Sequence, residues 1–203
     1  KVYELKKKDE YGGDFHCALK VISVPGSQKE YDEMLESMSE FAMRAKLREK
    51  VEEISNEYRL LGALRGHPNV VNCEDQMIIP HENDMGWDIY IRMELLQSLP
   101  DYVRENGMTV DSVIKLGSDM CSALELCREN NIIHRDIKPQ NIFVSRYGVF
   151  KLGDFGVAKA STIRTSADKV GTYSYMAPEV YKGKGYDDRV DIYSLGMVLY
   201  WLL

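Results

Sequence analysis

The sequence has few cysteines and no long apolar run. Only four of its 203 residues are cysteine, with no C-x-x-C pair or other metal-ligand spacing, which argues against a disulfide-stapled miniprotein and a cysteine metal site. No apolar stretch reaches the roughly eighteen residues of a membrane span, and no charged-then-apolar leader begins the chain. We therefore expect reduced thiols in the cytoplasm and no membrane segment in this chain, with an anchor outside it left open.

The chain also lacks an excess of basic residues. It carries 26 Lys and Arg against 32 Asp and Glu, a formal net charge of -6, which removes the broad positive surface that nucleic-acid binders need. We therefore expect no nucleic-acid partner. Apolar residues make up 44% and charged residues 29%, which is typical of a globular protein of one large domain or two small lobes.

The first half of the chain has the pattern of strands interrupted by a helical stretch. Residues 2–8 and 15–24 alternate or run apolar around a glycine-containing turn, which predicts a β-hairpin. Over residues 28–64, apolar side chains recur at helical spacing, which predicts one broken helix or two. Two further strands are expected near residues 73–79 and 87–95.

The second half is expected to be mainly helical. The pattern predicts a short helix over residues 99–105 and a long amphipathic helix over 110–128, with Thr109 placed to cap the long helix. Residues 190–203 again have a strongly apolar helical pattern. Strands first and helices second indicate an α+β protein.

This segregation of elements predicts two lobes within one domain. Residues 1–95 would form a strand-rich small lobe and residues 96–203 a helical large lobe, with the hinge at 95–98. The segment 28–50 is a long insert in the small lobe. Its Met and Leu stripe favours packing onto that lobe over a regulatory docking surface, and both interpretations stay open.

The densest polar segment follows the long predicted helix. Residues 134–141 read HRDIKPQN, and Pro139 argues against a continuous helix, so these charges belong to an ordered loop. Asp154 opens a DFG sequence eighteen residues after Asp136. Together with Asn141, these side chains offer what metal-assisted phosphoryl transfer needs: oxygen ligands for Mg²⁺ and a separate carboxylate facing the incoming hydroxyl.

These motifs resemble the signature set of the protein kinases. HRDIKPQN, DFG and the Ala-Pro-Glu sequence at 177–179 occur in the family's order, and the resemblance covers the chain from Val2 to Leu203. Lys138 and the Gly171-Thr172 pair resemble the residues at these positions in the serine/threonine branch. The sequence around the motifs is similar to that of bacterial eukaryotic-type kinases. The resemblance implies the bilobal kinase fold, ATP and Mg²⁺ as cofactors, and protein substrates.

The resemblance also implies a role for each matching residue. Asp136 would orient the acceptor hydroxyl and take its proton, and Lys138 would neutralise the moving phosphoryl group. Asn141 and Asp154 would hold two Mg²⁺ ions. Lys20 corresponds to the family's strand lysine and would grip the α and β phosphates of ATP.

The strand lysine is expected to pair with a glutamate on the following helix. Glu57 is the candidate, in preference to Glu52 and Glu53, because the GHPN turn follows it at nearly the family's interval. Leu61, one helical turn later, would pack towards Phe155 and so link the helix to the metal site.

The adenine pocket would lie near the hinge. The side chain of Met93 would line the rear of the pocket. Backbone groups of Glu94 and Leu96 would form hydrogen bonds with the adenine edge. Its apolar walls would be Val2, Ala18 and Phe143.

A polar run without periodicity precedes the Ala-Pro-Glu sequence, which indicates a mobile loop. Arg135 resembles the arginine that captures a phosphorylated residue on this loop. We therefore expect phosphorylation at Thr165 or Ser166, with Thr162 a weaker candidate, and we expect the protein itself to catalyse this transfer from ATP.

Three further residues have other expected roles. Thr172 would bond Asp136 and Lys138 and favour serine or threonine acceptors. His134 would pack rather than act as an acid or base. Asp191 would be buried in the last helix and bond the backbone of the catalytic loop.

The chain departs from the family pattern at its ends. Lys1 and Val2 match the last two positions of the glycine-rich loop G-x-G-x-x-G-x-V, so we expect the glycines and the closing helices of the large lobe outside the given residues. A catalytically silent pseudokinase or scaffold would normally lack Lys20, Asp136, Asn141 or Asp154. A small-molecule phosphotransferase would lack the Ala-Pro-Glu sequence and the long loop.

Overall fold

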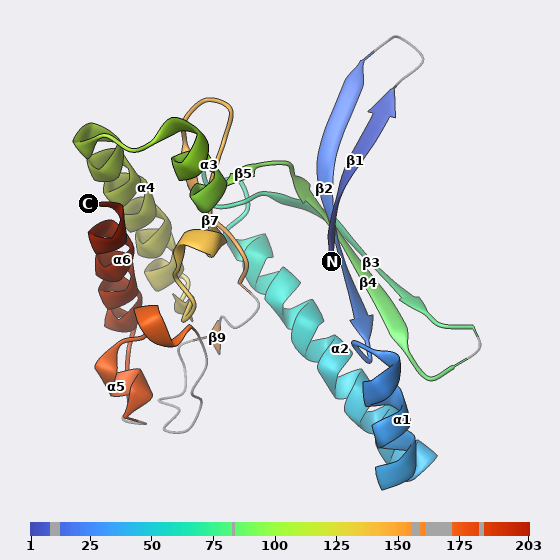
Figure 1. The fold of residues 1–203 in the computed structure, drawn as a ribbon. Helices are drawn as coiled ribbons and strands as arrows, with labels where there is room; N and C mark the ends of the chain where they lie inside the picture. Colours follow the sequence, from blue (N-terminus) through green and yellow to red (C-terminus); the bar gives the residue numbers. More distant parts are fainter. Residues whose placement is uncertain (9–12, 83, 156–158, 161–171, 183–184) are drawn as a thin grey trace. The chain divides into compact units, whose positions relative to one another are not determined.

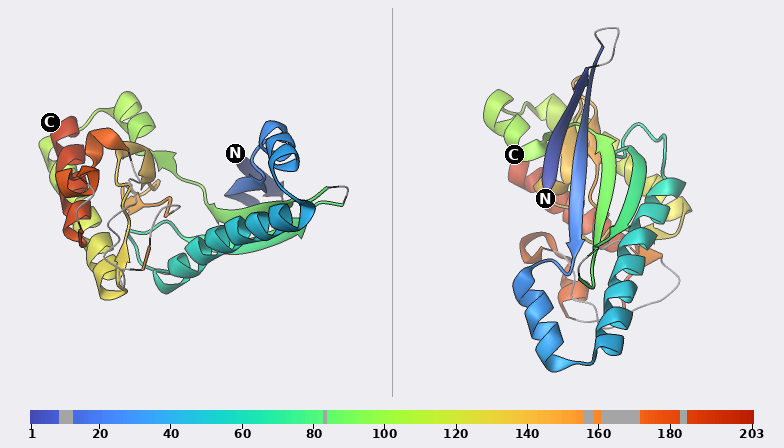
Figure 2. Two further views of the ribbon diagram at one scale, coloured as in Figure 1. Left: turned by 90° about the horizontal axis from the view of Figure 1, so that it is seen from below. Right: turned by 90° about the vertical axis from the view of Figure 1, so that its right-hand side faces the viewer.

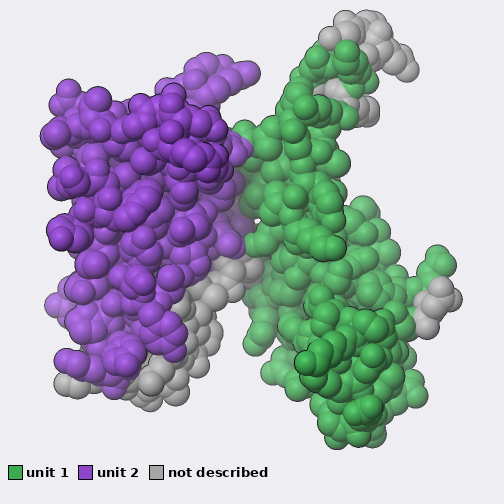
Figure 3. Space-filling view, viewed as in Figure 1, with its two compact units in different colours: residues 1–59, 72–95 green, residues 60–71, 96–203 purple. Residues whose placement is uncertain are grey.

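The chain divides into two compact units, coloured separately in Figure 3. The computed structural model describes residues 1–8, 13–82, 84–155, 159–160, 172–182 and 185–203. Unit 1 comprises residues 1–59 and 72–95, and unit 2 comprises residues 60–71 and 96–203. Each unit is described below by itself.

Unit 1 contains a four-stranded antiparallel sheet in the order β1-β2-β4-β3, seen in Figures 1 and 2. Its strands are β1 (Val2–Lys8), β2 (Asp14–Val24), β3 (Cys73–Pro80) and β4 (Trp87–Glu94). The predicted hairpin and the two later strands are confirmed, because β1 pairs with β2 and β3 with β4. Strand β2 lies inside the sheet between β1 and β4.

The helical stretch that follows β2 is two helices rather than one. Helix α1 (Gln28–Ser37) ends at Met38, and α2 (Glu40–Ala63) begins two residues later. Ser27 starts α1 because its hydroxyl accepts a hydrogen bond from the Glu30 N–H at 3.2 Å.

The insert buries part of its apolar stripe. Met34, Met43 and Leu47 are buried, as the packing interpretation requires, whereas Leu35 and Phe41 are exposed. The stripe is therefore only partly a core surface.

Unit 2 contains the remaining helices and several very short strands. Its helices are α3 (Leu99–Asn106), α4 (Val110–Glu129), α5 (Pro178–Tyr181) and α6 (Arg189–Leu202). Its strands are β5 (Gln97–Ser98), β6 (Ile132–Ile133), β7 (Ile142–Val144), β8 (Phe150–Leu152) and β9 (Lys159–Ala160). Two 3₁₀ turns, η1 (Pro139–Asn141) and η2 (Tyr173–Tyr175), complete it.

Helices α3, α4 and α6 agree with the sequence pattern, whereas the short α5 was not predicted. Thr109 caps α4, since its hydroxyl accepts a hydrogen bond from the Ser112 N–H at 3.2 Å. The short strands form a β5-β7-β8 sheet and a β6-β9 pair. The α+β class is therefore confirmed.

Within the described ranges no helix combines the length and apolar character of a membrane span.

One apolar core joins α3, α4 and α6 to the β7-β8 hairpin. Its fully buried members include Leu64, Leu99, Leu116, Ile137, Ile142, Leu152, Phe155 and Val198. The core explains why residues 60–71 group with unit 2, although the sequence order placed them in the first lobe.

Backbone bonds support the same grouping. The Leu152 N–H donates to the Asn69 carbonyl at 2.8 Å, and the Val71 N–H donates to the Leu152 carbonyl at 2.9 Å. The Asn69 side-chain amide also donates to the Phe150 carbonyl at 3.0 Å. The residues after α2 therefore extend the β7-β8 hairpin.

Helix α4 offers a matched test of this core. Leu116 is completely buried, whereas Ile114 is 65% exposed two residues earlier. We expect Leu116→Ala to lower the free energy of unfolding by about 2–5 kcal/mol because it leaves a cavity, and Ile114→Ala to change it by less than about 0.5 kcal/mol. Urea unfolding of both variants checks this, and equal losses would contradict the assigned core.

Candidate active site

One buried carboxylate binds the backbone of the polar loop between β6 and β7. Asp191, in the first turn of α6, is 2% exposed. Its Oδ2 accepts a hydrogen bond from the His134 N–H and its Oδ1 accepts one from the Arg135 N–H, both at 2.8 Å. Burial raises the pKa of Asp191. The structural role predicted for Asp191 is thus borne out by its contacts.

His134 packs inside the loop. It is completely buried, and burial lowers its pKa, so the ring is neutral at pH 7. Nδ1 accepts a hydrogen bond from the Asp136 N–H at 3.3 Å, so the proton is assigned to Nε2, which donates to the Gly153 carbonyl at 3.1 Å. The ring meets Phe155 edge to face, with centroids 4.6 Å apart. The expected packing role is confirmed.

Two residues near this loop adopt left-handed backbone conformations. The φ angles of Arg135 and Asp154 are 68° and 56°. Such values are uncommon for residues other than glycine and cluster at functional sites, where the surrounding structure supports them. For Arg135, the bond from its N–H to Asp191 supplies that support.

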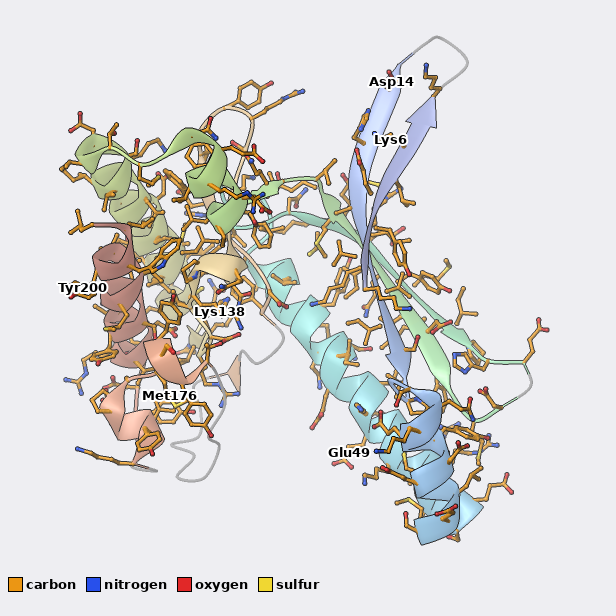
Figure 4. All side chains as sticks on the ribbon, in the orientation of Figure 1. Lys6, Asp14, Glu49, Lys138, Met176 and Tyr200 are labelled. Atoms are coloured by element: carbon orange, nitrogen blue, oxygen red, sulfur yellow. The ribbon has the colours of Figure 1, made fainter. Side chains whose placement is uncertain are left out.

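The carboxylate of Asp136 accepts four hydrogen bonds. Oδ2 accepts from Lys138 Nζ at 2.6 Å and from Asn141 Nδ2 at 3.0 Å. Oδ1 accepts from the Thr172 N–H at 2.9 Å and from its hydroxyl at 3.0 Å. Lys138 Nζ, whose residue Figure 4 labels, also donates to the Thr172 hydroxyl at 2.9 Å. The contacts predicted for Thr172 are therefore present.

Asn141 connects Asp136 to the segment that carries Asp154. Its side-chain amide also donates to the Asp136 carbonyl at 2.8 Å, and its own carbonyl accepts from the Gly153 N–H at 2.9 Å. Because Nδ2 is used within the loop, Oδ1 is the Asn141 atom suited to a metal ion. The Gly153 bond brings the residue before Asp154 beside Asn141.

Gly153 is a site residue that the interpretation of the motifs missed. A Cβ built on it would lie 2.7 Å from Val71 Cγ2 and 2.9 Å from Phe143 Cε2, too close for a real contact. A larger residue would therefore push against Phe143 on β7, for which the family resemblance implies a place in the adenine pocket. Only the position of Gly153 immediately before Asp154 hinted at this constraint.

The oxygen donors of unit 2 fit Mg²⁺ better than a softer metal. Asn141 and Asp154 offer an amide oxygen and a carboxylate, and Mg²⁺ prefers few protein ligands completed by phosphates and water. No group of three or more His, Cys, Asp or Glu side chains in the described segments has the arrangement of a metal site.

Unit 1 gathers several of the predicted ATP residues on one face of its sheet. Lys20 lies opposite Val2 on β1, and Ala18 lies opposite Met93 on β4. Because side chains alternate along a strand, Ala18 and Lys20 share a face, and their cross-strand partners project to the same side. Ala18 is 6% exposed, so part of this face is buried.

The remaining pocket residues are divided between the units. The Glu94 N–H donates to the Asn72 carbonyl at 3.1 Å, and the Glu94 carboxylate accepts from the Asn72 N–H at 2.6 Å. Its predicted adenine contact thus depends on its carbonyl. Leu96 and Phe143 belong to unit 2. The convergence of both sets around one nucleotide stays a prediction.

Several other predicted residues have only partial descriptions. Glu57 lies in α2, but its side chain is outside the described residues, as are Thr162, Thr165 and Ser166. Leu61 packs against the core that contains Phe155, as expected.

Arg135 has a hydrogen-bond partner that was not predicted from the sequence. Its Nη1 donates to the Tyr186 hydroxyl at 3.1 Å. Tyr186 packs against the small apolar cluster of Ile133, Ala177, Val180 and Val190. The only sign of this contact in the sequence was that Tyr186 is an aromatic residue just before the last helix.

Comparison with known proteins agrees with this geometry. The family model described as protein kinase domain matches residues 20–203. A protein named probable serine/threonine-protein kinase of Clostridium perfringens is 41% identical over 140 residues, which is 66% of this chain and 20% of that protein. The serine/threonine-protein kinase PknB of Mycobacterium tuberculosis is 41% identical over 149 residues, 70% of this chain and 24% of PknB.

A eukaryotic protein also matches. Serine/threonine-protein kinase 36 of Pongo abelii is 36% identical over 161 residues, 77% of this chain and 12% of that protein. The chain therefore spans about a quarter or less of the length of these relatives.

The Asp191 anchor can be tested against its neighbour. In Asp191→Asn, one of the two acceptor oxygens becomes an amide that faces a backbone N–H, so we expect the free energy of unfolding to fall by about 1–3 kcal/mol. Asp188, at the N-cap of α6, makes no capping hydrogen bond through its side chain, so Asp188→Asn is the matched control. Urea denaturation measures both, and similar stability of the two variants would argue against the anchor.

Proposed function

Because the chain belongs to the protein kinase domain family, we propose that it is the catalytic part of a serine/threonine protein kinase that transfers the terminal phosphoryl group of ATP to protein hydroxyls. The observation that carries the proposal is the bonding of Asp136 to Lys138, Asn141 and Thr172. The relatives' names support the serine/threonine class.

Asp136 is suited to receive an acceptor hydroxyl. Its Oδ1 already accepts a hydrogen bond from the Thr172 hydroxyl at 3.0 Å, the same chemical group that a serine or threonine substrate would present. The carboxylate would orient that hydroxyl and take its proton late, since the transition state is loose and positioning contributes more than deprotonation.

Lys138 would stabilise the negative charge of the transferred group. Its ammonium lies between the Asp136 carboxylate and the Thr172 hydroxyl, and its side chain is 22% exposed. Partial burial strengthens the interaction of this charge with an incoming phosphoryl group relative to bulk water. The ion pair with Asp136 holds the ammonium in place.

The cofactors would be ATP and Mg²⁺. Asn141 Oδ1 and the Asp154 carboxylate would hold the ions, which when bound would supply positive charge to neutralise the phosphates. Lys20 would contact the α and β phosphates and pair with Glu57. Adenine would bind between Val2, Ala18, Met93, Glu94, Leu96 and Phe143.

Regulation by loop phosphorylation follows from the same proposal. The protein would phosphorylate Thr165 or Ser166 of its own loop, and Arg135 would bind the added phosphate through charge-assisted hydrogen bonds. The protein would phosphorylate its protein substrates in the cytoplasm.

A catalytically silent scaffold is the second candidate. Such a protein would bind partners or nucleotide through the same fold without transferring phosphate. The presence of Lys20, Asp136, Asn141 and Asp154 together favours the active enzyme.

Asp136→Asn separates chemistry from binding. The amide keeps the shape of the side chain but cannot accept the hydroxyl proton, so we expect phosphate transfer from labelled ATP to casein to fall about 10²–10⁴-fold, while calorimetric ATP affinity stays within about twofold because binding and general-base catalysis depend on different groups. Asp111→Asn, an exposed change in the first turn of α4, is the control and should match the parent protein.

Each outcome of this experiment has a distinct meaning. Unimpaired transfer by Asp136→Asn would refute the assigned base. Absence of transfer by the intact parent protein, with ATP still bound, would favour the scaffold. Transfer to aminoglycoside or choline but not to casein would favour a small-molecule phosphotransferase.

A further inference from the structure

The turn between β3 and β4 is built around His81. The His81 N–H donates to the Gly86 carbonyl at 2.9 Å, which closes the turn. Gly86 is buried, and a Cβ built on it would lie 2.5 Å from His81 Nδ1 and 2.8 Å from the Val24 carbonyl. The imidazole and the end of β2 therefore pack directly against Gly86, and no larger residue fits between them.

Both ring nitrogens of His81 face carboxylates. Nδ1 lies 2.6 Å from Asp84 Oδ1 in the turn, and Nε2 lies 3.4 Å from Asp88 Oδ1 on β4. A neutral imidazole has one N–H and can donate to only one of these oxygens, whereas an imidazolium can donate to both. Only the doubly protonated ring therefore forms ion pairs with both carboxylates.

Asp88 extends this interaction to the neighbouring strand. Its Oδ1 accepts a hydrogen bond from the Ser23 hydroxyl at 2.7 Å, and Ser23 lies opposite Asp88 in the β2-β4 ladder. The Tyr90 hydroxyl donates weakly to Asp88 Oδ2 at 3.5 Å. Asp88 thus bridges His81 and the end of β2.

The chain that leaves β2 is held to the helical hairpin by a second acid. Three residues after Ser23, the Gly26 N–H donates to Glu30 Oε2 on α1 at 2.8 Å. Glu30 Oε1 accepts from Lys50 Nζ on α2, also at 2.8 Å. The start of α1 is therefore attached on one side to α2 and on the other, through β2, to the His81 turn.

We propose that His81 is a proton-operated clasp that, when doubly protonated, joins the β3-β4 turn to the end of β2 and so to the start of α1. Asp84 and Asp88 are the charged groups that face it; Glu82, the other acid in the described part of the turn, is exposed. No described group here has the arrangement of a metal site. The clasp is independent of the proposed kinase chemistry.

The direction of the pH effect follows from the surroundings of His81. Partial burial alone would lower its pKa, but the hydrogen bonds and charges of Asp84 and Asp88 together outweigh burial and raise the pKa. A histidine with a raised pKa contributes stability that is complete below the unfolded value of about 6.5 and is lost as the pH rises through the folded value. The clasp is closed below the pKa of folded His81 and opens above it.

Nuclear magnetic resonance of the intact protein with labelled histidine tests the clasp. We expect His81 to titrate above about 6.5 and the protection factors of the hydrogen-bonded Gly26 and His81 amides to fall as the pH passes its midpoint. His81→Gln should lose this pH dependence, and Asp84→Asn should lower the midpoint. His16→Gln is the matched control, because His16 faces the single carboxylate of Glu4 elsewhere in the sheet.

The wild-type titration decides the proposal even if a variant fails to fold. A His81 midpoint at or below about 6.5, or protection factors that stay constant through the titration, would overturn it. Loss of the pH dependence in His16→Gln would also overturn it, since the effect would then belong to another histidine. None of these readouts requires kinase activity.

Discussion

The candidate site depends on one buried carboxylate, that of Asp191. Its two oxygens hold the backbone of His134 and Arg135, and this anchor supports the left-handed conformation of Arg135. The next residue, Asp136, is thereby directed towards Lys138. A loop without regular secondary structure would otherwise have to order itself at substantial conformational entropy cost. The buried anchor and the neutral His134 give the loop a fixed shape before any substrate arrives.

Much of the fold was predictable because it depends on local patterns. The β1-β2 hairpin, both long helices and the Thr109 cap follow from periodicity and capping chemistry. The short strands of unit 2 were not predictable, since two or three residues cannot show an alternation. The grouping of residues 60–71 with unit 2 depends on packing of Leu64 and Val70 into a distant core, which sequence order does not reveal.

The site was predictable to the extent that it follows a motif. The contacts of Thr172 and Asp191 were expected from resemblance and are present. Gly153 and Tyr186 were missed because their roles come from close approach of Val71 and Phe143 in one case and from a single bond to Arg135 in the other. Crowding and single tertiary bonds leave no periodic signature.

We propose that Lys20 of unit 1 and Asp136, Asn141 and Asp154 of unit 2 act on one magnesium-bound triphosphate. The most direct measurement is a crystal structure of the intact protein with Mg²⁺ and a non-hydrolysable ATP analogue. We expect Lys20 Nζ to contact the phosphates whose Mg²⁺ ions are bound by Asn141 and Asp154. A nucleotide bound away from Lys20, or Mg²⁺ held by other side chains, would contradict it.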